Sequence, residues 1–594
     1  MRRNKPGRLT PAKSSEKRQV HNNMLYDGKV LDIIRKFGQL AETSYGPTGR
    51  LKFLQTSAGG HVTVTSCCSS IIHHLMGVSH PVLRLIMMAI KGHLELYKDG
   101  GLAIAILITR LVESSLDLDV PRAVILEVNS EAQDEIKNYL ASETCSWKMK
   151  INISDMKSMI CLVRTVVGTK PACQISEDEQ ESLCTVLLEA FLQTIPSITK
   201  DKESLQISPD AIQFLYCEGS PVSETKVFQG VVLQAPEIPT YSKNTPKLSN
   251  LKVALYNVSM AGDTDEWFEG VSQVVSGEME QAEMSEGVVN QMKGVASALV
   301  QAGVGLVACQ KCIHPTLKEF LKEKGVYVIE RLSILHIGSV QQLTGAKILS
   351  TFALDVPRDW FGHVGKIEHL VMGSKSYLHL IPSAEQPPSS WHPVSTVVLC
   401  SPDETSLNEL KTVCQSAISV LHGVLSSPYV VPGGGCLDTH LAWYLRSRAR
   451  QCTPESLERI GATKAQFLTV MNNIARCLET VSKSLEHDGG DHVYDSLDHH
   501  HWIIPPGSDP NTASIPSCVC GLVSRDEFEG EWCITGSDFD LSGTGQSPFT
   551  RNGPIERSFS NSIIDLYASK MSALCTVFET LNVLLRVKHL VSDG

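Results

Sequence analysis

The sequence predicts an α+β multidomain protein in which both ends of the chain form one helical domain and the middle forms an inserted α/β domain. Two observations lead to this prediction. Wide apolar stripes at helical spacing lie near both ends, and the middle alternates short Val-rich runs with helical stretches. The 594 residues, 42% of them hydrophobic and 20% charged, suffice for several hydrophobic cores and exclude disorder of the whole chain.

The helices at the two ends are predicted from apolar residues that recur every three or four positions. Residues 81–97 carry such a stripe, the Asp99-Gly100-Gly101 turn interrupts it, and residues 102–116 resume it. Near the C-terminus, residues 460–485 and 563–590 carry stripes of similar width. Stripes this wide need partner helices to cover them, so we expect both ends of the chain to share one helical core.

The middle of the chain shows the alternation that is typical of an α/β domain. Strands are predicted over residues 251–257, 303–308, 325–329 and 395–399, and helices over residues 286–302 and 315–324. Residues 487–555 follow neither pattern, because they repeat Ser, Gly and Asp and contain Pro505-Pro506-Gly507. We interpret them as a long surface insertion in the final helical part.

The net charge of -11 at pH 7 is unevenly distributed. Basic side chains concentrate in residues 1–23, which we interpret as a solvated, disordered tail; a nuclear address or a nucleic-acid arm is the alternative. The acidic remainder disfavours broad binding to phosphate backbones, so we expect no nucleic-acid partner. The longest apolar stretches fall short of the roughly 18 residues that a bilayer span needs, and we identify no secretory signal, so we expect no membrane span.

The 18 cysteines are scattered, and we expect them to be reduced thiols in a cytosolic core. Two groups resemble metal sites. Cys309-x-x-Cys312-x-His314 has no obvious second pair of ligands. Cys518-x-Cys520, with Cys533 and the histidines at 499–501, lies in a stretch with many turn formers. We therefore expect this histidine run to be an exposed loop, and we expect no zinc at either group.

Three glycine clusters could bring backbone N–H groups to a phosphate: residues 44–49, the Asp99-Gly100-Gly101 turn and residues 431–435. The last two precede helices, whose N-termini favour anions. Each cluster alone is more often a helix cap or a tight turn, and Asp99 could serve only as a cap. Their joint occurrence at opposite ends of the chain is more informative than any one of them.

The order of these motifs resembles the group II chaperonins, the ring-forming foldases of eukaryotes and archaea. The resemblance rests on Tyr45-Gly46-Pro47-Thr48-Gly49-Arg50, His80-Pro81, Asp99-Gly100, Leu343-Thr344-Gly345-Ala346 and Gly433-Gly434-Gly435, and it covers about residues 24–594. It implies a group II chaperonin subunit fold with a helical equatorial domain, a small intermediate domain and an α/β apical domain. The implied bounds are 24–150 and 428–594 for the equatorial domain, 151–228 and 387–427 for the intermediate domain, and 229–386 for the client-binding apical domain.

Within that family, the sequence is similar to the divergent chaperonin-like proteins connected with the McKusick–Kaufman and Bardet–Biedl syndromes. The stretches that carry this similarity are Lys170-Pro171-Ala172-Cys173, residues 309–318, Gly433-Gly434-Gly435-Cys436 and residues 484–490. The similarity implies an assembly factor that binds unfolded or unassembled clients and promotes assembly of the Bardet–Biedl ciliary trafficking complex, the BBSome. The implied partners are other Bardet–Biedl chaperonin-like proteins, cytosolic group II chaperonin subunits and BBSome subunits. The implied location is the cytoplasm and the centrosome or basal body, with nuclear entry if the basic tail is an address.

Departures from the family pattern imply a degenerate ATPase site. Where active chaperonins have a Gly-Asp-Gly-Thr-Thr loop, residues 98–102 keep Asp99 as a Mg²⁺ ligand but lack both hydroxyls. Cys67 and Ser416 replace two carboxylates, and the one at Ser416 would have positioned the attacking water. The retained nucleotide-binding positions are Gly46, Pro47, Asp99, Gly100, Gly101, Gly434, Gly435 and Asp565. The resemblance thus implies weakened or lost binding of ATP with Mg²⁺, and absent or very slow hydrolysis.

Two other functions stay open at this point. One is an active ATP-driven foldase that relies on Asp99, Asp565 and the glycine turns. The other is a regulatory subunit that docks on a chaperonin ring without binding clients. Residues 262–286, where active relatives build a lid, are strongly acidic here, so we do not expect this segment to close a cavity.

Overall fold

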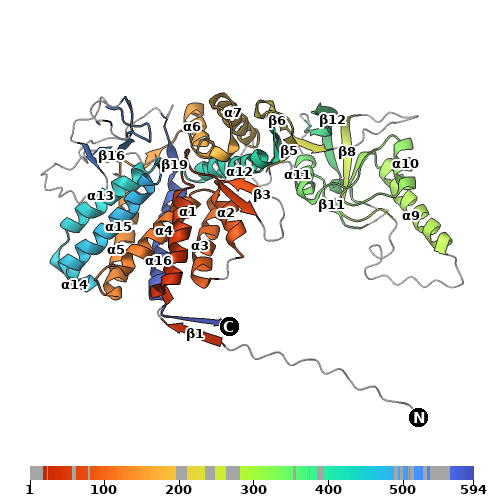
Figure 1. The fold of residues 1–594 in the computed structure, drawn as a ribbon. Helices are drawn as coiled ribbons and strands as arrows, with labels where there is room; N and C mark the ends of the chain where they lie inside the picture. Colours follow the sequence, from red (N-terminus) through yellow and green to blue (C-terminus); the bar gives the residue numbers. More distant parts are fainter. Residues whose placement is uncertain are drawn as a thin grey trace, which may run out of the picture. The chain divides into compact units, whose positions relative to one another are not determined.

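The computed structural model describes residues 18–22, 24–55, 62–77, 80–143, 145–195, 211–234, 248–261, 281–351, 356–373, 375–383, 393–486, 492–495, 500–505, 508, 514–525, 532–534, 559 and 562–593. The chain divides into two compact units (Figure 1). Unit 1 combines Met1–Asn152 with Ser427–Gly594, and unit 2 is Ile153–Ser426. The α+β multidomain class that the sequence predicts is confirmed.

The core of unit 1 is a set of helices from both ends of the chain. α4 packs against α1, α15 and α16, which run beside it in Figure 1. Nearly every side chain of α4 from Gly101 to Val112 is buried, because this segment is apolar on all sides and needs neighbours all round. The helices of unit 1 are α1 (Gly28–Glu42), α2 (Cys68–Leu75), α3 (Pro81–Tyr97), α4 (Gly101–Leu116), α5 (Arg122–Ala141), α13 (Cys436–Arg450), α14 (Pro454–Ile460), α15 (Lys464–Lys483) and α16 (Tyr567–Arg586), with the 3₁₀ helix η1 (Met24–Tyr26).

Small antiparallel sheets join segments of unit 1 that are far apart in the sequence. β1 pairs with β20, so that Arg18 lies opposite Asp593, and β15 pairs with both β4 and β19. β2 and β3 form a hairpin, and β16 pairs with β17 and β18. These strands are β1 (Arg18–Asn22), β2 (Lys52–Gln55), β3 (Val62–Thr65), β4 (Met149–Lys150), β15 (Tyr429–Pro432), β16 (His492–Asp495), β17 (His501–Ile503), β18 (Trp532–Ile534), β19 (Ile564–Leu566) and β20 (His589–Asp593).

Two of the four predicted helices of unit 1 form as expected, and two are divided. α3 coincides with the predicted segment 81–97, and α4 begins one residue before the predicted start. The stripe over 460–485 is divided because Gly461 ends α14 in a left-handed conformation and the Thr463 side chain caps α15. In the stripe over 563–590, residues Ile564–Leu566 form strand β19 before α16 begins.

Part of the described 487–555 insertion is buried, whereas the sequence predicts a surface segment. Trp502, Ile504, Cys518 and Cys520 are at most 3% exposed and belong to the hydrophobic core of unit 1. The prediction is wrong for these residues because single large apolar side chains can reach a core from a segment whose average composition is that of a loop.

The prediction that the histidine run is exposed is also wrong for the two histidines that the structure describes. His500 is 5% exposed and His501 is fully buried. His499 and the side chain of Cys533 lie outside the described residues. Two adjacent imidazoles are therefore held inside unit 1, where their nitrogens need polar partners.

Unit 2 contains a mixed sheet in the order β10-β9-β8-β12-β13-β7, with β11 beside β8. β8, β9 and β10 are parallel and are connected through α9 and α10, which is the α/β alternation that the sequence predicts. Ala254 and Tyr256 of β8 pack into one core and Val253 and Leu255 into another, so both faces of this sheet are covered. A second sheet has the order β5-β14-β6.

The elements of unit 2 account for all four predicted strands and both predicted helices, with ends that differ by a few residues. The helices are α6 (Met156–Val167), α7 (Glu177–Gln193), α9 (Gln281–Gln301), α10 (Pro315–Glu323), α11 (Ile334–Thr344) and α12 (Glu404–Ser426), with η2 (Pro171–Cys173), η4 (Val222–Glu224) and η5 (Arg358–Trp360). The strands are β5 (Ile212–Glu218), β6 (Lys226–Gln229), β7 (Val231–Gln234), β8 (Ser249–Tyr256), β9 (Val304–Cys309), β10 (Tyr327–Ile329), β11 (Ile348–Leu349), β12 (Gly362–Met372), β13 (Lys375–Ile381) and β14 (Ser395–Ser401).

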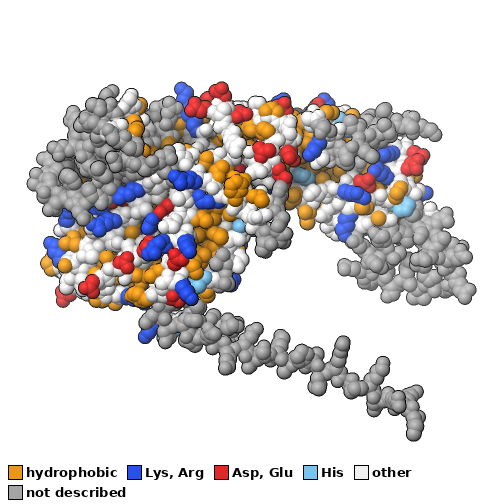
Figure 2. Space-filling view, viewed as in Figure 1, with side chains coloured by type: hydrophobic (Ala, Val, Ile, Leu, Met, Phe, Trp, Pro, Cys, Tyr) orange, Lys and Arg blue, Asp and Glu red, His pale blue; other side chains and the backbone are white. Residues whose placement is uncertain are grey.

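The surface of the described residues carries charges of both signs. Figure 2 shows Lys and Arg side chains mixed with Asp and Glu over the visible face of the unit 1 helices, which is typical of a solvated surface. Among the described residues, no helix is both long and apolar enough to cross a membrane. The side chains of the acidic segment 262–286 and the first 17 residues of the basic tail lie outside the described residues.

Candidate functional site

The first glycine turn of unit 1 follows α1 and is closed by other parts of the same unit. Gly46 has φ +84°, and a Cβ there would lie 2.7 Å from Cδ2 of Leu485. Thr48 Oγ1 donates a hydrogen bond to the Leu485 carbonyl at 3.3 Å, whereas Pro47 is exposed. Gly46 is therefore required by a left-handed backbone and by close packing against the end of α15.

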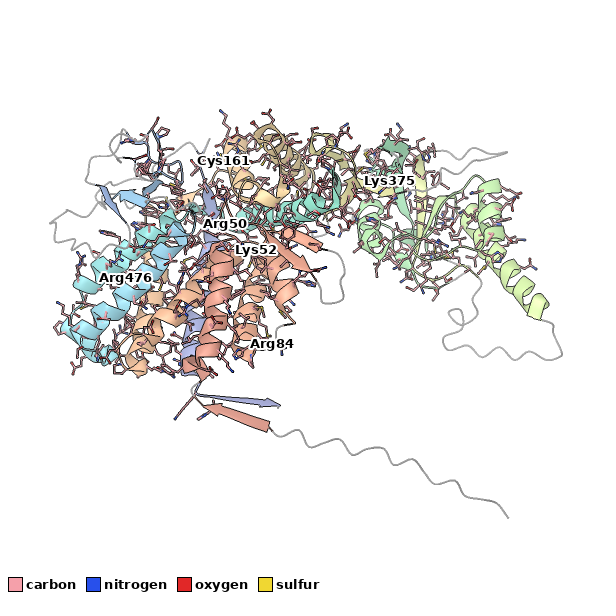
Figure 3. The ribbon with its side chains drawn as sticks, viewed as in Figure 1. Arg50, Lys52, Arg84, Cys161, Lys375 and Arg476 are labelled. Carbon is pink, nitrogen blue, oxygen red and sulfur yellow. The ribbon has the colours of Figure 1, made fainter. Side chains whose placement is uncertain are left out.

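Two cationic side chains follow this turn. Arg50 and Lys52 lie near each other after the end of α1 (Figure 3). Lys52 Nζ donates to the Arg50 carbonyl at 2.8 Å. Burial and the neighbouring Arg50 guanidinium lower the pKa of Lys52. These cations lie close to a turn that the sequence links to phosphate.

The second turn joins α3 to α4 and holds Asp99. Lys98 ends α3 in a left-handed conformation with φ +55°, and Gly100 precedes α4 with φ +78°. The ring N–H of the buried His93 donates to the Asp99 carbonyl at 3.0 Å, which fixes the turn through its backbone. In the described part of the chain the Asp99 carboxylate caps neither helix, so the interpretation of Asp99 as only a cap is wrong.

The start of α2 lies against this second turn. A Cβ at Gly101 would lie 2.8 Å from Sγ of Cys68. Cys67 precedes α2, is 4% exposed, and its backbone N–H donates to Thr65 Oγ1 at 2.9 Å. The structure thus brings the Cys67-Cys68 pair beside Gly101, where the family pattern would have a carboxylate and hydroxyls.

Three carboxylates from distant segments gather around one buried lysine. Lys570 Nζ of α16 lies 2.7 Å from Oδ2 of Asp438 on α13, and the Asp438 side chain is only 1% exposed. Burial lowers the pKa of Lys570, but Asp438, Asp565 and Asp99 together raise it above its ordinary value. We call Asp99, Asp438, Asp565 and Lys570 the acid–lysine cluster.

The acid–lysine cluster also influences the pKa values of Asp565 and of the neighbouring Tyr45. Burial raises the pKa of Asp565 to about 6; Lys570 opposes this shift, and Asp99 and Asp438 add to it. Burial, followed by Asp438, Asp565 and Asp99, raises the pKa of the Tyr45 phenol well above its ordinary value. Asp99, Asp565 and Tyr45, which the sequence selects separately, thus lie close enough to influence one another electrostatically.

The third glycine turn is enclosed by protein on the face where side chains would stand. A Cβ at Gly433 would lie 3.1 Å from Oδ1 of Asp565, and one at Gly434 would lie 2.7 Å from Cγ1 of Val519 in the insertion. Gly435 meets Ser482, whose Oγ donates to the Gly435 carbonyl at 2.8 Å. This turn packs closely against its own unit, which explains the three glycines without a ligand.

The remaining predicted residues lie elsewhere. Ser416 belongs to α12 of unit 2, is buried, and its hydroxyl donates to the Thr412 carbonyl at 3.0 Å. Cys309 of β9 is fully buried; burial raises the pKa of its thiol to about 11, and the thiol donates to the Val258 carbonyl. The His314 ring accepts the Thr316 N–H at the start of α10. A helix cap and a core thiol account for these two residues.

Sequence reasoning missed Asp438 and Lys570. Each lies on a helix among buried residues, with no local motif around it. The signal that could have found Asp438 is its position three residues after Gly435, on the first turn of a helix that buries Cys436, Leu437 and Leu441. A carboxylate at such a position needs a cation within reach.

Known proteins resemble this chain over most of its length. A model of the TCP-1/cpn60 chaperonin family matches residues 37–594, and the chain belongs to that family. It is 31% identical over 573 residues to the molecular chaperone MKKS of Mus musculus, covering 95% of this chain and 96% of the relative. The MKKS chaperone of Homo sapiens is 30% identical over 574 residues, with the same coverage. The thermosome subunit alpha of Sulfurisphaera tokodaii is 24% identical over 448 residues, covering 74% of this chain and 75% of the relative.

The chain is therefore an MKKS-like member of the chaperonin family. The family resemblance and the similarity to its divergent branch, both predicted from motifs, are confirmed.

Proposed function

We propose that this chain is a chaperonin-like assembly factor that holds unfolded or unassembled clients on apolar side chains of unit 2, within residues 229–386. Membership of the chaperonin family and the similarity to MKKS support this proposal. The observation that carries it is a pair of adjacent aliphatic side chains at the start of α11. Ile334 is 73% exposed and Leu335 is 79% exposed.

The rest of α11 holds this pair in place. Val340 and Leu343 of the same helix are buried in the sheet core of unit 2. The Leu335 N–H donates to Ser333 Oγ and the Leu335 carbonyl accepts from Gln213 Nε2, both at 3.3 Å. Two aliphatic side chains are thus presented to water on a fixed backbone, and an apolar client segment would remove them from water at little cost in ordering.

Client holding is tested by replacing the pair with Ile334→Ser and Leu335→Ser. We expect a several-fold loss in the capacity of the full chain to suppress aggregation of a chemically denatured model protein, measured by light scattering. Leu96→Ser is the matched control, because Leu96 is 73% exposed on α3 of unit 1. Equal loss in the control, or no loss in the double variant, would contradict the proposal.

We also propose that the acid–lysine cluster is a degenerate ATPase site in which nucleotide binding is weak or lost. The residues present fit a triphosphate poorly. Lys570 already neutralises Asp438, the faces of Gly46 and Gly434 meet Leu485 and Val519, and residues 101 and 102 supply no hydroxyl. A hard cation is fitted better, because the Asp99 carboxylate makes no hydrogen bond within the described residues.

A steady-state phosphate-release assay tests this second proposal. We expect turnover at the level of a buffer blank, unchanged by Asp99→Ala, since loss of a positioned base alone costs about 10²–10⁴ in rate. Chaperonin-like turnover that Asp99→Ala abolishes would instead establish the active foldase. The active foldase is tested as an alternative because the carboxylates of Asp99 and Asp565 are retained.

The clients and partners proposed for the chain are BBSome subunits, other Bardet–Biedl chaperonin-like proteins and cytosolic group II chaperonin subunits, met in the cytoplasm and at centrosomes or basal bodies. Similarity to MKKS supports these partners. Proximity labelling with the parent chain and with the Ile334→Ser, Leu335→Ser variant tests them. Clients should depend on the pair, whereas a subunit that only docks on a chaperonin ring would keep the same neighbours in both samples.

A further inference from the structure

Cys436, the first residue of α13, lies in a group of three cysteines and one histidine. Sγ of Cys436, Sγ of Cys520 and a ring nitrogen of His500 all lie within 4.8 Å of one another. Nδ1 of His500 is 3.2 Å from Cys520 Sγ, and Cys518 Sγ is 3.1 Å from Cys520 Sγ. Cys436 and Cys518 also interact through their side chains. We call these four residues the thiol–imidazole cluster.

The thiol–imidazole cluster is closed off from water. The exposed fractions are 0% for Cys436, 5% for His500, 3% for Cys518 and 0% for Cys520. The Trp147 indole stacks on the His500 ring with centroids 4.8 Å apart. The ring orientation is thus fixed by packing, with Nδ1 aimed at the sulfur atoms.

Several neighbouring groups can stabilise negative charge on the sulfur atoms. The Val523 N–H donates to Cys518 Sγ at 3.4 Å, and Nδ1 of His501 lies 3.6 Å from Cys436 Sγ. Cys436 is the first residue of α13, whose N-cap is Gly435 with no side-chain capping bond. Backbone N–H groups and an uncapped helix N-terminus both stabilise negative charge on sulfur.

We propose that Cys436, Cys518, Cys520 and His500 bind one structural zinc ion in a Cys₃His site. Zn–S bonds of about 2.3 Å in a tetrahedron place sulfurs about 3.8 Å apart, within the spread of separations seen here. Binding leaves each sulfur as thiolate, so up to three thiol protons pass to solvent as the ion enters. Among the described residues, no other His, Cys, Asp or Glu group lies close enough together to hold a metal ion.

The competing explanations are a packed set of neutral thiols and a disulfide. Neutral thiols behave as small apolar groups, but apolar packing alone does not require polar atoms of three separate segments to lie within 4.8 Å of one another. The Cys518–Cys520 sulfur separation of 3.1 Å exceeds the roughly 2.05 Å of a covalent bond. Zinc is preferred because one ion would satisfy all four groups at once.

The proposed ion would fasten the insertion to the helical core. Cys518 and Cys520 flank Val519, whose side chain covers Gly434 and whose N–H donates to the His501 carbonyl at 2.9 Å. The Ile563 N–H donates to the Cys520 carbonyl at 2.8 Å, which ties the same loop to the segment before β19. A zinc ion here would keep Val519 seated on the third glycine turn.

The test uses the full chain, purified under reducing conditions without chelator, and elemental analysis of its metal content. We expect about one zinc ion per chain, lost in Cys436→Ser and in Cys520→Ser. Cys477→Ser is the matched control, because Cys477 is 5% exposed in the same core and outside the cluster. It should keep the ion.

Cobalt uptake keeps the proposal testable if a cysteine variant fails to fold. The zinc-free parent should bind one Co²⁺ with the absorption of a tetrahedral thiolate complex, and zinc should displace it. The inference is overturned if the reduced parent holds no zinc and takes up no cobalt, if both cysteine variants keep the ion, or if mass analysis finds a disulfide within the cluster.

Discussion

At the start of α13, two residues that are two positions apart enter two different buried polar clusters. In each cluster a buried polar group needs a partner, and the two clusters supply that partner differently. Asp438 enters the acid–lysine cluster and is neutralised by a lysine of the same chain, 2.7 Å away. Cys436 enters the thiol–imidazole cluster, where the described neighbours are further sulfur and nitrogen ligands. A buried charge must be paired, so the first cluster is complete within the protein whereas the second converges on an added cation.

This difference bears on the proposed degenerate ATPase site. In the acid–lysine cluster, a protein ammonium lies among carboxylates that could otherwise face a metal-bound phosphate. In the thiol–imidazole cluster, the insertion contributes ligands and places Val519 on the glycine turn. In both clusters, groups that a ligand could contact are engaged by other parts of unit 1.

The largest effect is expected when the acid–lysine cluster loses its cation. Lys570→Met leaves the Asp438 carboxylate buried and unpaired, which should destabilise unit 1 by about 3–5 kcal/mol. Urea denaturation followed by tryptophan fluorescence measures the change. The exposed Lys588→Met is the control and should stay within about 0.5 kcal/mol of the parent.

A second variant separates the charge from the packing of Lys570. Adding Asp438→Asn to Lys570→Met removes the unpaired carboxylate, so part of the lost stability should return. If the single Lys570→Met variant matched the Lys588→Met control, the lysine would not be neutralising a buried charge and the comparison of the two clusters would fail.

The next effect is a pH dependence carried by Asp565. Its pKa of about 6 in the folded chain lies above the ordinary value of 3.8, so the folded state holds this proton more tightly than the unfolded state. The proton on Asp565 therefore adds to the free energy of unfolding. This contribution is fully present below pH 4 and is lost as pH rises through 6. The loss amounts to at most about 3 kcal/mol, since one pKa unit corresponds to about 1.36 kcal/mol.

Asp565→Asn tests this sign because asparagine does not titrate. The stability of the variant relative to the parent should increase between pH 4 and pH 7, as measured by urea denaturation at several pH values. Subtracting the two curves cancels the titration of all shared groups. A difference that stays constant, or that falls with pH, would place Asp565 outside the coupled cluster.

The last effect concerns overpacking where the insertion contacts the glycine turn. Gly434→Ala forces a Cβ into a left-handed backbone with φ +60° and to within 2.7 Å of Val519 Cγ1. Gly461→Ala is a matched control, because Gly461 has φ +69° but nothing within 4 Å of a built Cβ. Both should lose about 1–2 kcal/mol to backbone strain, and Gly434→Ala about 1–3 kcal/mol more to overpacking. Adding Val519→Ala to Gly434→Ala should recover only the stability lost to overpacking. Equal losses of stability in Gly434→Ala and Gly461→Ala would mean that Val519 does not pack against the turn.

The sequence predicts most of the helical framework because apolar periodicity reports burial directly. The segment 81–97 coincides with α3, and the four predicted strands of unit 2 all form. It does not predict the break at Gly461, because the apolar period continues across it, nor strand β19, whose pairing with β15 depends on a partner more than 130 positions away.

The candidate site is predicted only where residues form a local motif. Gly46, Asp99 and Gly434 stand out in short glycine-containing turns, and the structure couples Asp99 to Asp565. Asp438 and Lys570 carry no such signal, because their relation exists only after α13 and α16 pack. The sequence does not predict Cys436 as a metal ligand, because it lies far in sequence from Cys518 and Cys520.

The assembly of unit 1 from both ends of the chain sets the order in which the protein can fold during synthesis. Residues of α1 and α4 share one core with α15 and α16, so this core cannot close before the last segment leaves the ribosome. At about 5–20 residues per second, translation of residues 427–594 takes roughly 10–30 s after unit 2 is complete. Throughout that interval the apolar side chains of α4 lack the cover that α15 and α16 provide in the folded unit.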